Sequence, residues 1–495
     1  MQDNKILGRI LRTSRETPVF LLSELYPPGS GGEPDRKHVE SIMSRLRLFG
    51  MLVENKGADY RITRRSPLRF TLSEKDRVIM QSFLERPEVP DKLQMLVGDY
   101  IRKKTGKEWQ HPLTLERIRS AVMMQKGEYW HEGTRKKIVY NKGYQVFAYL
   151  AYQFPVYYIQ FYHIFLMLAE SGLLNDHMTI LDAGSGPGAT TLAITDFLRR
   201  TGHGTADIYA IELSEEQREA YTFLTSGFSR GVKQVNINPV IEGDISNIDK
   251  ETLPRDVDLL VFQNVLNEMS DLNPADRATL VNNLSEVLSP NGIALIVEPA
   301  DLSNSVGLRE LAGELSRRYG FIVISPCIPG WTRSCRPERC WSFVEKSPVR
   351  PTRLMDAVSD HPESYRFRNT DIKYSYAVLS KDPKKARREY LHSDKKTAPL
   401  SSLSRHIGKK INVCAAVMSG DLGNSRTHLW KLCDGSPQKP VYAVMPSYHG
   451  SPGNLVLRTA SYGQVIRLSG VLVRYNDQHD SYNLLVNRDT RVDIS

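Results

Sequence analysis

The stretch from Thr179 to Gly188, which reads TILDAGSGPG, constrains the fold of this chain more than any other. An apolar run ends in an acid and a glycine-rich turn, and a segment of helical character begins at Ala189. Glycine lets the backbone adopt positive φ and pass close to a ligand without a Cβ clash. The free N–H groups of the following helix favour a carboxylate or a phosphate. The sequence therefore predicts the first strand, loop and helix of an α/β domain that binds a nucleotide-type ligand.

Further segments downstream have the composition of strands in the same sheet, and the segment 258–264 is almost wholly apolar, as a buried parallel strand should be. These segments are 207–212, 239–244, 258–264, 292–299 and 319–325. Acids end the first three strands at Asp182, Glu212 and Asp244. Glu212 follows Gly188 at close to the spacing at which an acid meets ribose hydroxyls. The pattern predicts a Rossmann-like α/β domain whose loop is used for binding, with an unused glycine turn as the alternative.

The order of the loop, Asp-x-Gly-x-Gly-x-Gly, differs from the dinucleotide fingerprint Gly-x-Gly-x-x-Gly. It resembles the S-adenosylmethionine loop of class I methyltransferases, in which adenine is usually contacted at the position of Asp244. We therefore expect S-adenosylmethionine as the cofactor. The expected cofactor-binding residues are Asp182, Gly184, Gly186, Gly188, Glu212, Asp244 and Asn264.

The catalytic residues are not visible in the sequence. Amino-directed methyltransferases of nucleic acids commonly carry an Asn/Asp-Pro-Pro-aromatic motif after the fourth strand. Here the chain reads QNVLNE from Gln263 to Glu268, and no cysteine nucleophile is evident. The sequence thus predicts the methyl-donor site and leaves the acceptor atom open.

Composition adds bounds on size, partners and compartment. A chain of 495 residues is too long for one core. Its formal charge of +10 favours an acidic partner, with nucleic acid first, an anionic membrane second and no such partner as the alternative. No apolar run reaches the roughly 18 residues that span a bilayer, and the first residues lack the apolar core of a signal peptide. We expect no membrane association, and a cytoplasmic location if the protein is prokaryotic.

The chain divides into five predicted regions. They are a winged-helix-like region at 1–65, a helical region at 66–172, the methyltransferase domain at 173–380, a basic linker at 381–402 and an OB-like β-barrel at 403–495. In the first region, residues from Asp35 to Leu52 have helical spacing, with Asp35 as the cap of the helix and Gly50 as its end, and a hairpin across Gly57 follows. Six basic side chains there suit contact with nucleic-acid phosphates: Arg36, Lys37, Arg45, Arg47, Arg64 and Arg65. The alternative is that the region is a helical module that docks onto a protein.

Two regions offer surfaces for nucleic acid. The segment 140–168 is rich in tyrosine, for which we favour core packing over base stacking. The barrel is predicted from short strands at 411–417, 428–433, 441–445, 465–475 and 482–486. Small barrels of this type often bind single strands, with protein contact as the alternative. The run 384–388 is basic, which is typical of a solvated face or an RNA contact.

Three of the five cysteines, Cys327, Cys335 and Cys340, lie within fourteen residues. Thiolates this close suit zinc or an iron–sulfur cluster, and either usually needs a fourth ligand. The alternative is that three unreactive thiols are clustered by chance. The other two cysteines, Cys414 and Cys433, lie in the predicted barrel. If one of them were the fourth ligand, the metal would link the barrel to the α/β domain. If the strand before Cys327 is parallel, the loop leaves its carboxyl end, on the ligand-binding edge.

These passages together resemble the methyltransferase-like family involved in mitochondrial small-ribosomal-subunit assembly, which also has bacterial and archaeal members. The resemblance rests on 149–155, on the loop from Asp182 to Gly188, on 326–343 and on 371–376, with 433–435 and 461–463 as a fifth passage. It covers roughly residues 130 to 470, and the chain looks like an archaeal or bacterial member. The resemblance implies a 4Fe–4S cluster held by four cysteines, with zinc as the alternative metal, and association with small-subunit rRNA. Cys433 fits the fourth position better than Cys414.

The resulting hypothesis is an S-adenosylmethionine-dependent, methyltransferase-like protein that acts on or with small-subunit rRNA, or a pre-ribosomal particle, in ribosome assembly or translation. A non-catalytic RNA-binding assembly factor with the same fold is the second hypothesis. A small-molecule methyltransferase with accessory domains is the third, and the basic charge and the barrel argue against it. No protein partner is evident from the sequence.

Overall fold

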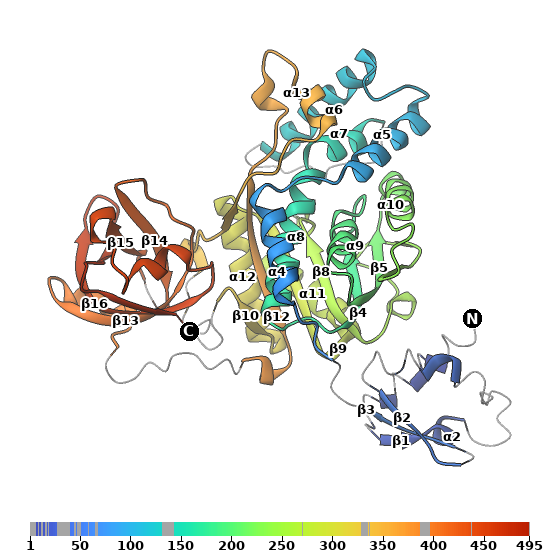
Figure 1. The fold of residues 1–495 in the computed structure, drawn as a ribbon, viewed down its shortest axis with the longest axis horizontal. Coiled ribbons are helices and arrows are strands. Elements are labelled where there is room, and N and C mark those ends of the chain that lie inside the picture. The colour runs from blue at the N-terminus through green and yellow to red at the C-terminus, as the bar shows by residue number, and fades with distance from the viewer. Residues whose placement is uncertain are drawn as a thin grey trace. The chain divides into compact units, whose positions relative to one another are not determined.

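The computed structural model divides the chain into two compact units (Figure 1). The first contains residues 1–261, 284–292 and 347–370, and the second contains 262–283, 293–346 and 371–495. The structure describes residues 51–57, 59–64, 68–130, 143–269, 271–327, 335, 337–386, 397–436 and 438–494, with the short pieces 6–7, 9–10, 13–14, 17, 19–26, 40–43 and 46. Within these residues, no helix is both long and apolar enough for a bilayer crossing.

A three-stranded antiparallel sheet forms the described core of the N-terminal region. Its elements are β1 (Val19–Leu21), α2 (Leu22–Leu25), β2 (Met51–Asn55) and β3 (Tyr60–Arg64). β2 and β3 form the predicted hairpin, with Gly57 at a φ of 80° in its turn. Residues 40–43 and 46 are helical, and Ile42 and Leu46 are buried in the same core. The hairpin and these helical residues match the predicted winged-helix-like region.

Part of that prediction falls outside the described residues. The residues concerned are Asp35 and Gly50, expected at the ends of the helix, and the basic residues Arg36, Lys37, Arg45, Arg47 and Arg65. Arg64 is described, and its guanidinium pairs with the Asp256 carboxylate at 3.4 Å.

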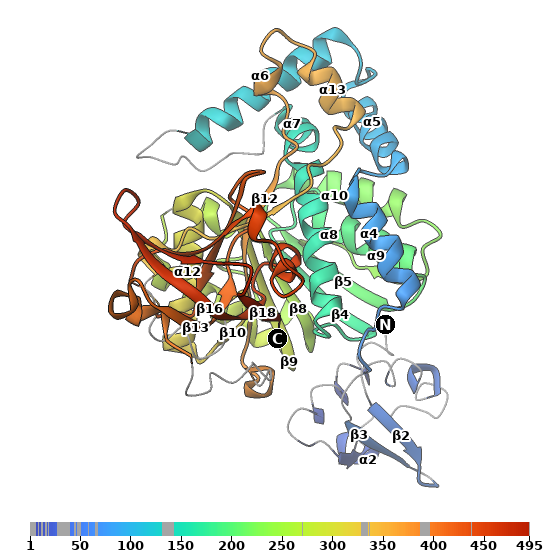
Figure 2. The ribbon, with the colours of Figure 1, turned by 60° about the vertical axis from the view of Figure 1, so that its left-hand side comes forward.

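The middle of the first unit is helical. Its helices are α4 (Glu74–Glu85), α5 (Asp91–Thr105), α6 (Pro112–Trp130), α7 (Gln145–Tyr152), α8 (Phe154–Glu170) and α13 (Arg353–Ser359). Although α13 is distant in sequence, it packs against α5, α6 and α7 (Figure 2). Tyr158 and Tyr162 on α8 are fully buried, so core packing is confirmed for this part of the tyrosine-rich segment. Tyr140 lies outside the described residues.

A nine-stranded sheet runs through both units, because β8 and β9 contribute residues to each. Hydrogen bonding follows the order β10-β12-β9-β8-β4-β5-β6, with β7 beside β5 and β11 beside β12. The strands are β4 (His177–Ala183), β5 (Thr205–Glu212), β6 (Val235–Ile237), β7 (Ile241–Glu242), β8 (Val257–Gln263), β9 (Leu288–Pro299), β10 (Ile322–Ser325), β11 (Val344–Lys346) and β12 (Ile372–Ser380). Helices α9 (Ala189–Thr201), α10 (Glu215–Phe228), α11 (Pro274–Leu284) and α12 (Leu302–Tyr319) connect them. This is the predicted class I, Rossmann-like α/β sheet.

Strand directions decide where the cysteine loop begins. β4 pairs in parallel with β5 and β8, whereas β12 is antiparallel to both β9 and β10. β10 therefore runs in the same direction as β9. The segment that carries Cys327 leaves the carboxyl end of β10, as the sequence predicts for a parallel strand.

The C-terminal part of the second unit is a closed five-stranded barrel, drawn in orange to red in Figures 1 and 2. Its strands are β13 (Lys410–Val417), β14 (Thr427–Cys433), β15 (Val441–Pro446), β16 (Val465–Asn476) and β17 (Ser481–Leu485), and β18 (Arg491–Ile494) adds to β16. The ring closes because β13 pairs with both β14 and β16. Trp430 and alternate side chains of the other strands fill its interior. The OB-like barrel of the sequence prediction is confirmed.

Candidate cofactor and metal sites

The glycine loop turns sharply between β4 and α9. Gly184, Gly186 and Gly188 have φ values of 78°, 54° and 94°, in the left-handed region that favours glycine. Gly188 is the residue before the first turn of α9, so the loop delivers the chain directly into a helix N-terminus. Such a terminus offers unpaired N–H groups to an anionic group of a ligand.

Glu212 ties the loop to the end of β5. One carboxylate oxygen, Oε2, accepts a hydrogen bond from the Gly186 N–H at 2.9 Å. The other, Oε1, accepts from the Ser214 N–H at 2.8 Å. Burial raises the pKa of Glu212, and these backbone bonds counteract the rise. The carboxylate is thus fixed in orientation, while the lone pairs that remain on its oxygens can still accept ribose hydroxyls.

Asp182, at the end of β4, is 1% exposed. Burial, with the nearby charge of Glu212, raises the pKa of Asp182 to about 8, and a hydrogen bond with Thr190 partly opposes this. Its Oδ2 atom has no hydrogen-bond partner among the described residues. Two buried acids side by side favour a cationic ligand, because a positive group would stabilise both carboxylates.

The glycines of the loop have different neighbours. A Cβ on Gly186 would lie 3.7 Å from the Tyr149 hydroxyl, in ordinary contact. A Cβ on Gly188 would lie only 2.9 Å from Cδ2 of Tyr221 on α10. Gly188 therefore permits close helix packing, and Gly186 borders the space beneath Tyr149. Sequence reasoning assigned Tyr149 only to a core-packing segment. Its place in the motif 149–155, which the resemblance had marked, was the available signal.

The remaining predicted cofactor residues lie at strand ends. Asp244 follows β7, in which Glu242 pairs in register with Glu212 of β5. The Oδ1 atom of Asp244 accepts a hydrogen bond from the Ser246 N–H at 2.8 Å. Asn264 follows β8 with a φ of 53°, and its N–H donates to the Val297 carbonyl at 2.8 Å. A cofactor role for either residue stays a prediction.

The structure gathers the predicted sulfur ligands within the second unit. Cys335, Cys340 and Cys433 line one cavity of about 390 Å³. Cys327 and Cys433 pack against the same small apolar group of Ala416, Met418 and Val465. The Cys433 sulfur also accepts a hydrogen bond from the Gly435 N–H at 3.2 Å, in the predicted Asp-Gly turn.

Electrostatics connect the same four thiols. Burial raises the pKa of Cys335 to about 12, and Cys327 and Cys340 add to the rise. Burial also raises the pKa of Cys433, with further contributions from Cys340, Cys327 and Cys335. A thiol this hard to ionise alone becomes a thiolate when a metal binds it.

Cys414 differs from these four. It touches the same apolar group, but the charges that act on its thiol are those of Arg467 and Asp434. Among the described residues, no three histidine, cysteine or acidic side chains are already close enough together to hold an ion. Four thiols in one unit are a donor set that suits a metal preferring sulfur, and the choice of Cys433 over Cys414 as the fourth ligand stays a prediction.

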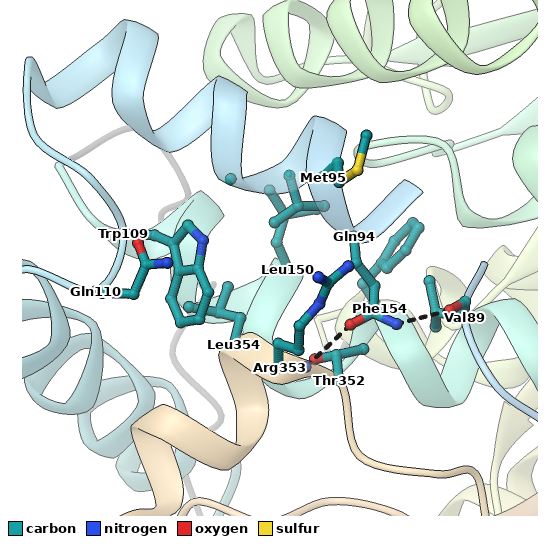
Figure 3. Close-up of a pocket in the computed structure, with 12 residues that line it drawn as sticks. Val89, Gln94, Met95, Trp109, Gln110, Leu150, Phe154, Thr352, Arg353 and Leu354 are labelled. Atoms are coloured by element: carbon teal, nitrogen blue, oxygen red, sulfur yellow. Dashed lines mark hydrogen bonds between the residues drawn. The ribbon is translucent and has the colours of Figure 1, made fainter. Parts of the chain in front are cut away.

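A separate cavity of about 150 Å³ lies among the helices of the first unit (Figure 3). It is lined mainly by apolar side chains, including Trp109, Leu150 and Leu354. Gln94 closes one side, since it donates to the Val89 carbonyl at 2.8 Å and accepts from the Arg353 N–H at 3.0 Å. None of the predicted site residues lines this cavity.

Family models and solved structures match different parts of this chain. Residues 401–495 match a family model described as the C-terminal domain of a domain of unknown function, DUF8157. Solved structures similar to this chain include an S-adenosylmethionine-dependent methyltransferase from Clostridium acetobutylicum (18% identity, TM-score 0.23, covering 29% of this chain and 50% of that one). Others are a putative one from Methanococcus maripaludis (16%, 0.24, 46% and 85%) and magnesium protoporphyrin IX methyltransferase from Synechocystis with bound SAH (10%, 0.29, 54% and 98%).

No curated protein matches the sequence. Residues 143–411, more than half of the chain, match the family model described as mitochondrial small ribosomal subunit Rsm22. This match includes the glycine loop, Glu212 and the three clustered cysteines. The chain therefore belongs to the Rsm22 family.

Proposed function

We propose that this protein binds S-adenosylmethionine and acts as a methyltransferase on, or together with, the rRNA of the small ribosomal subunit, in the cytoplasm of a prokaryotic cell. The observation that carries the proposal is the hydrogen bond between the Gly186 N–H and the Glu212 carboxylate, beside buried Asp182. It holds a glycine loop, an acid suited to ribose and a second buried acid in one place.

Each part of the donor has a matching group in this chain. The N-terminus of α9 and the N–H groups of the loop suit the carboxylate of the methionine part. Asp182 suits its ammonium group, Glu212 suits the ribose hydroxyls and Asp244 lies on the turn that such enzymes use for adenine. When bound, the cofactor supplies an electrophilic methyl group on a positively charged sulfur. The buried acids favour that cation over a neutral ligand.

The four thiols Cys327, Cys335, Cys340 and Cys433 are proposed as ligands of a 4Fe–4S cluster, with zinc as the alternative. Both metals take four thiolates, and the thiols already interact with one another. When bound, the centre supplies folding free energy that links the segment after β10 to the barrel.

RNA is the proposed partner because of charge and family. The barrel from 403 to 495 carries eleven lysines and arginines against six aspartates and no glutamate. A basic barrel suits a phosphate backbone. The family description names the small ribosomal subunit, which supports its rRNA as the RNA concerned.

A specific observation favours the second candidate, a non-catalytic assembly factor. With its amide nitrogen facing the carboxylate, Asn267 donates to Glu298 Oε2 at 2.9 Å and to the Asn264 carbonyl at 3.2 Å. Both Asn267 and Glu298 are buried, at 4% exposure each. The segment after β8, where an acceptor base would be expected, is therefore engaged within the protein interior.

One experiment separates the two candidates. RNA crosslinked to the protein in cells is sequenced, and methylation at the crosslinked sites is compared in deletion strains that express wild type, Glu212→Ala or the control Glu215→Ala. A mark lost in the deletion and in Glu212→Ala, but kept in Glu215→Ala, supports methyl transfer. Unchanged marks with defective small subunits in the deletion support the assembly factor. If no rRNA is crosslinked, both candidates are wrong.

A further inference from the structure

Arg309 on α12 is a buried cation in the second unit. The residue is 5% exposed. One terminal nitrogen of its guanidinium, Nη1, donates to the Tyr376 carbonyl at 2.7 Å, and Nη2 donates to the Tyr462 hydroxyl at 3.1 Å. Its Nε has no hydrogen-bond partner within the described part of the chain.

The surroundings of Arg309 do not balance its charge. Among the described residues, the ionisable groups that act on Arg309 include no carboxylate, although a buried charge is costly unless it is paired. The groups that act on it are thiols and phenols. Burial by itself would lower the pKa of Arg309, but Tyr462, Cys327 and Cys340 raise it.

Tyr462 connects the guanidinium to the sulfur atoms. Its hydroxyl also bonds to the Ser342 hydroxyl, two residues after Cys340. Its ring packs against the same apolar group as Cys327 and Cys433. The next residue, Gly463, approaches so closely that a Cβ on it would lie 3.1 Å from Cα of Pro326, which precedes Cys327. These contacts connect Arg309, through Tyr462, to the segments that carry Cys327 and Cys340.

Charge counting shows what this arrangement suits. A divalent zinc ion with four thiolates has a net charge of −2, and so does an oxidised 4Fe–4S cluster, whose core carries +2, with four thiolates. Burying such a centre is costly without a nearby cation. A buried guanidinium with a spare N–H would offset half of that charge and could donate a hydrogen bond toward sulfur.

From this geometry we propose that Arg309 is the buried counter-cation of a four-thiolate metal centre, and that Tyr462 positions its guanidinium from the barrel side. The inference rests on the metal site proposed above. Arg309 is a positioning residue, because it acts on the centre through charge and hydrogen bonding and does not ligate the metal. The same contacts make binding of the metal and docking of the barrel depend on each other within this unit.

The test uses the full-length protein purified with its metal under anaerobic conditions. Arg309→Met removes the charge at similar volume, Arg309→Lys keeps the charge without the planar fork, and Tyr462→Phe removes one hydrogen bond. Arg317→Met is the control on the same helix, where the side chain is 63% exposed. The readouts are iron, sulfide and zinc per chain, the rate at which a chelator removes the metal, the reduction potential of any cluster and the free energy of unfolding.

We expect Arg309→Met to weaken metal retention by about 10- to 100-fold, as partners of metal ligands commonly do. If the metal is an iron–sulfur cluster, the fraction retained should have a more negative reduction potential, because loss of a positive charge disfavours the added electron. Arg309→Lys should fall between Arg309→Met and wild type, and Tyr462→Phe should alter retention less than Arg309→Met. Arg317→Met should match wild type.

Two results have different meanings. If wild type holds a metal and Arg309→Met retains it at the wild-type rate and potential, Arg309 is not the counter-cation, whatever the variant does to stability. If wild-type protein prepared without air contains neither iron nor zinc, the metal site itself is wrong and the role of Arg309 fails with it. If Arg309→Met is too unstable to purify, Arg309→Lys and Tyr462→Phe take its place. Metal retention below wild type in Arg309→Lys supports the role, whereas wild-type retention and potential in both variants contradict it.

Discussion

The glycine-loop site buries acidic groups, whereas the cysteine site buries a basic one. In the first, Asp182 and Glu212 are acids whose pKa values burial raises, and one oxygen of Asp182 lacks a partner among the described residues. In the second, Arg309 is a buried cation. Burial acts to lower the pKa of Arg309, but the nearby phenols and thiols raise it. Without a ligand, the first site therefore favours a protonated Asp182, whereas the second site leaves the charge of Arg309 without a carboxylate beside it.

The difference matches the two ligands proposed above. A cationic sulfonium ligand would neutralise the acids of the first site, and an anionic metal–thiolate centre would neutralise the arginine of the second. The sites also differ in construction. Asp182 and Glu212 are thirty residues apart on neighbouring strands, whereas Cys340 and Cys433 are separated by more than ninety. Local backbone builds the first site, and long-range packing builds the second.

The largest expected effect breaks the second site. Cys433→Ser should remove most of the bound metal, because Cys433 lines the cavity with Cys335 and Cys340 and receives the Gly435 N–H. The variant should also unfold more easily, since structural metal binding contributes free energy of folding. Metal and sulfide analysis of protein purified without air measures the loss, and denaturant titration measures stability.

Cys414→Ser is the matched control from the same barrel. It should keep the metal, since the charges near its thiol are those of Arg467 and Asp434 and not of another cysteine. Loss of metal in Cys414→Ser with retention in Cys433→Ser would reverse the ligand assignment. Retention in both would mean that no barrel cysteine binds the metal.

The next effect tests the first site. Glu212→Ala should weaken S-adenosylmethionine binding about 10- to 150-fold, because each hydrogen bond to a charged group is worth about 1.5–3 kcal/mol. Isothermal calorimetry with S-adenosylhomocysteine and S-adenosylmethionine gives the affinities. Glu215→Ala, an exposed acid in the first turn of α10, should bind as wild type does. Equal affinity of wild type and Glu212→Ala would contradict the site.

A smaller effect concerns the charge of Asp182. Its pKa is raised to about 8 in the folded protein from an ordinary value of 3.8, so the folded state holds a proton that the unfolded state releases. Stability from this group is therefore complete below about pH 4 and is lost as pH rises toward 8, at no more than about 1.4 kcal/mol per pH unit. Asp182→Asn should make the slope shallower by this group's share, as measured by denaturant unfolding from pH 4 to 8 without ligand, while Glu298 and Asp258, whose pKa values burial raises to about 8 and about 6, keep their own contributions. A variant that keeps the wild-type slope would place the buried proton elsewhere.

Much of the first site could be predicted from the sequence, because its parts are consecutive. The run of apolar residues before Asp182, the glycines and the acid at Glu212 each state a local backbone requirement that sequence spacing preserves. What spacing could not reveal is that Gly188 serves the packing of Tyr221, or that Tyr149 lies over Gly186. Both contacts depend on the angles between helices, which side-chain type alone does not determine.

The second site was predictable in residue type but not in surroundings. Clustering indicated Cys327, Cys335 and Cys340, and a resemblance indicated Cys433. Arg309 carried no signal, because an arginine in an amphipathic helix usually faces solvent, as Arg317 and Arg318 do. It is buried and donates a hydrogen bond to Tyr462 of the barrel, and such a contact across 150 residues cannot be derived from periodicity.

The last expected effect separates the two glycines of the loop. Gly188→Ala adds a Cβ 2.9 Å from the Tyr221 ring at a φ of 94°, so either α10 must shift or the loop must change conformation. We expect a loss of about 1–3 kcal/mol in the free energy of unfolding, with cofactor affinity nearly unchanged when the folded fraction is accounted for. Gly186→Ala has room for its Cβ beside Tyr149, so apart from the strain of its φ of 54° its cost should fall on the cofactor, because that space borders the loop where the donor is proposed to lie. Calorimetry and denaturant titration of both variants give the comparison. If Gly188→Ala loses affinity and Gly186→Ala loses only stability, the ligand lies on the α10 side of the loop and the assignment of the two glycines must be exchanged.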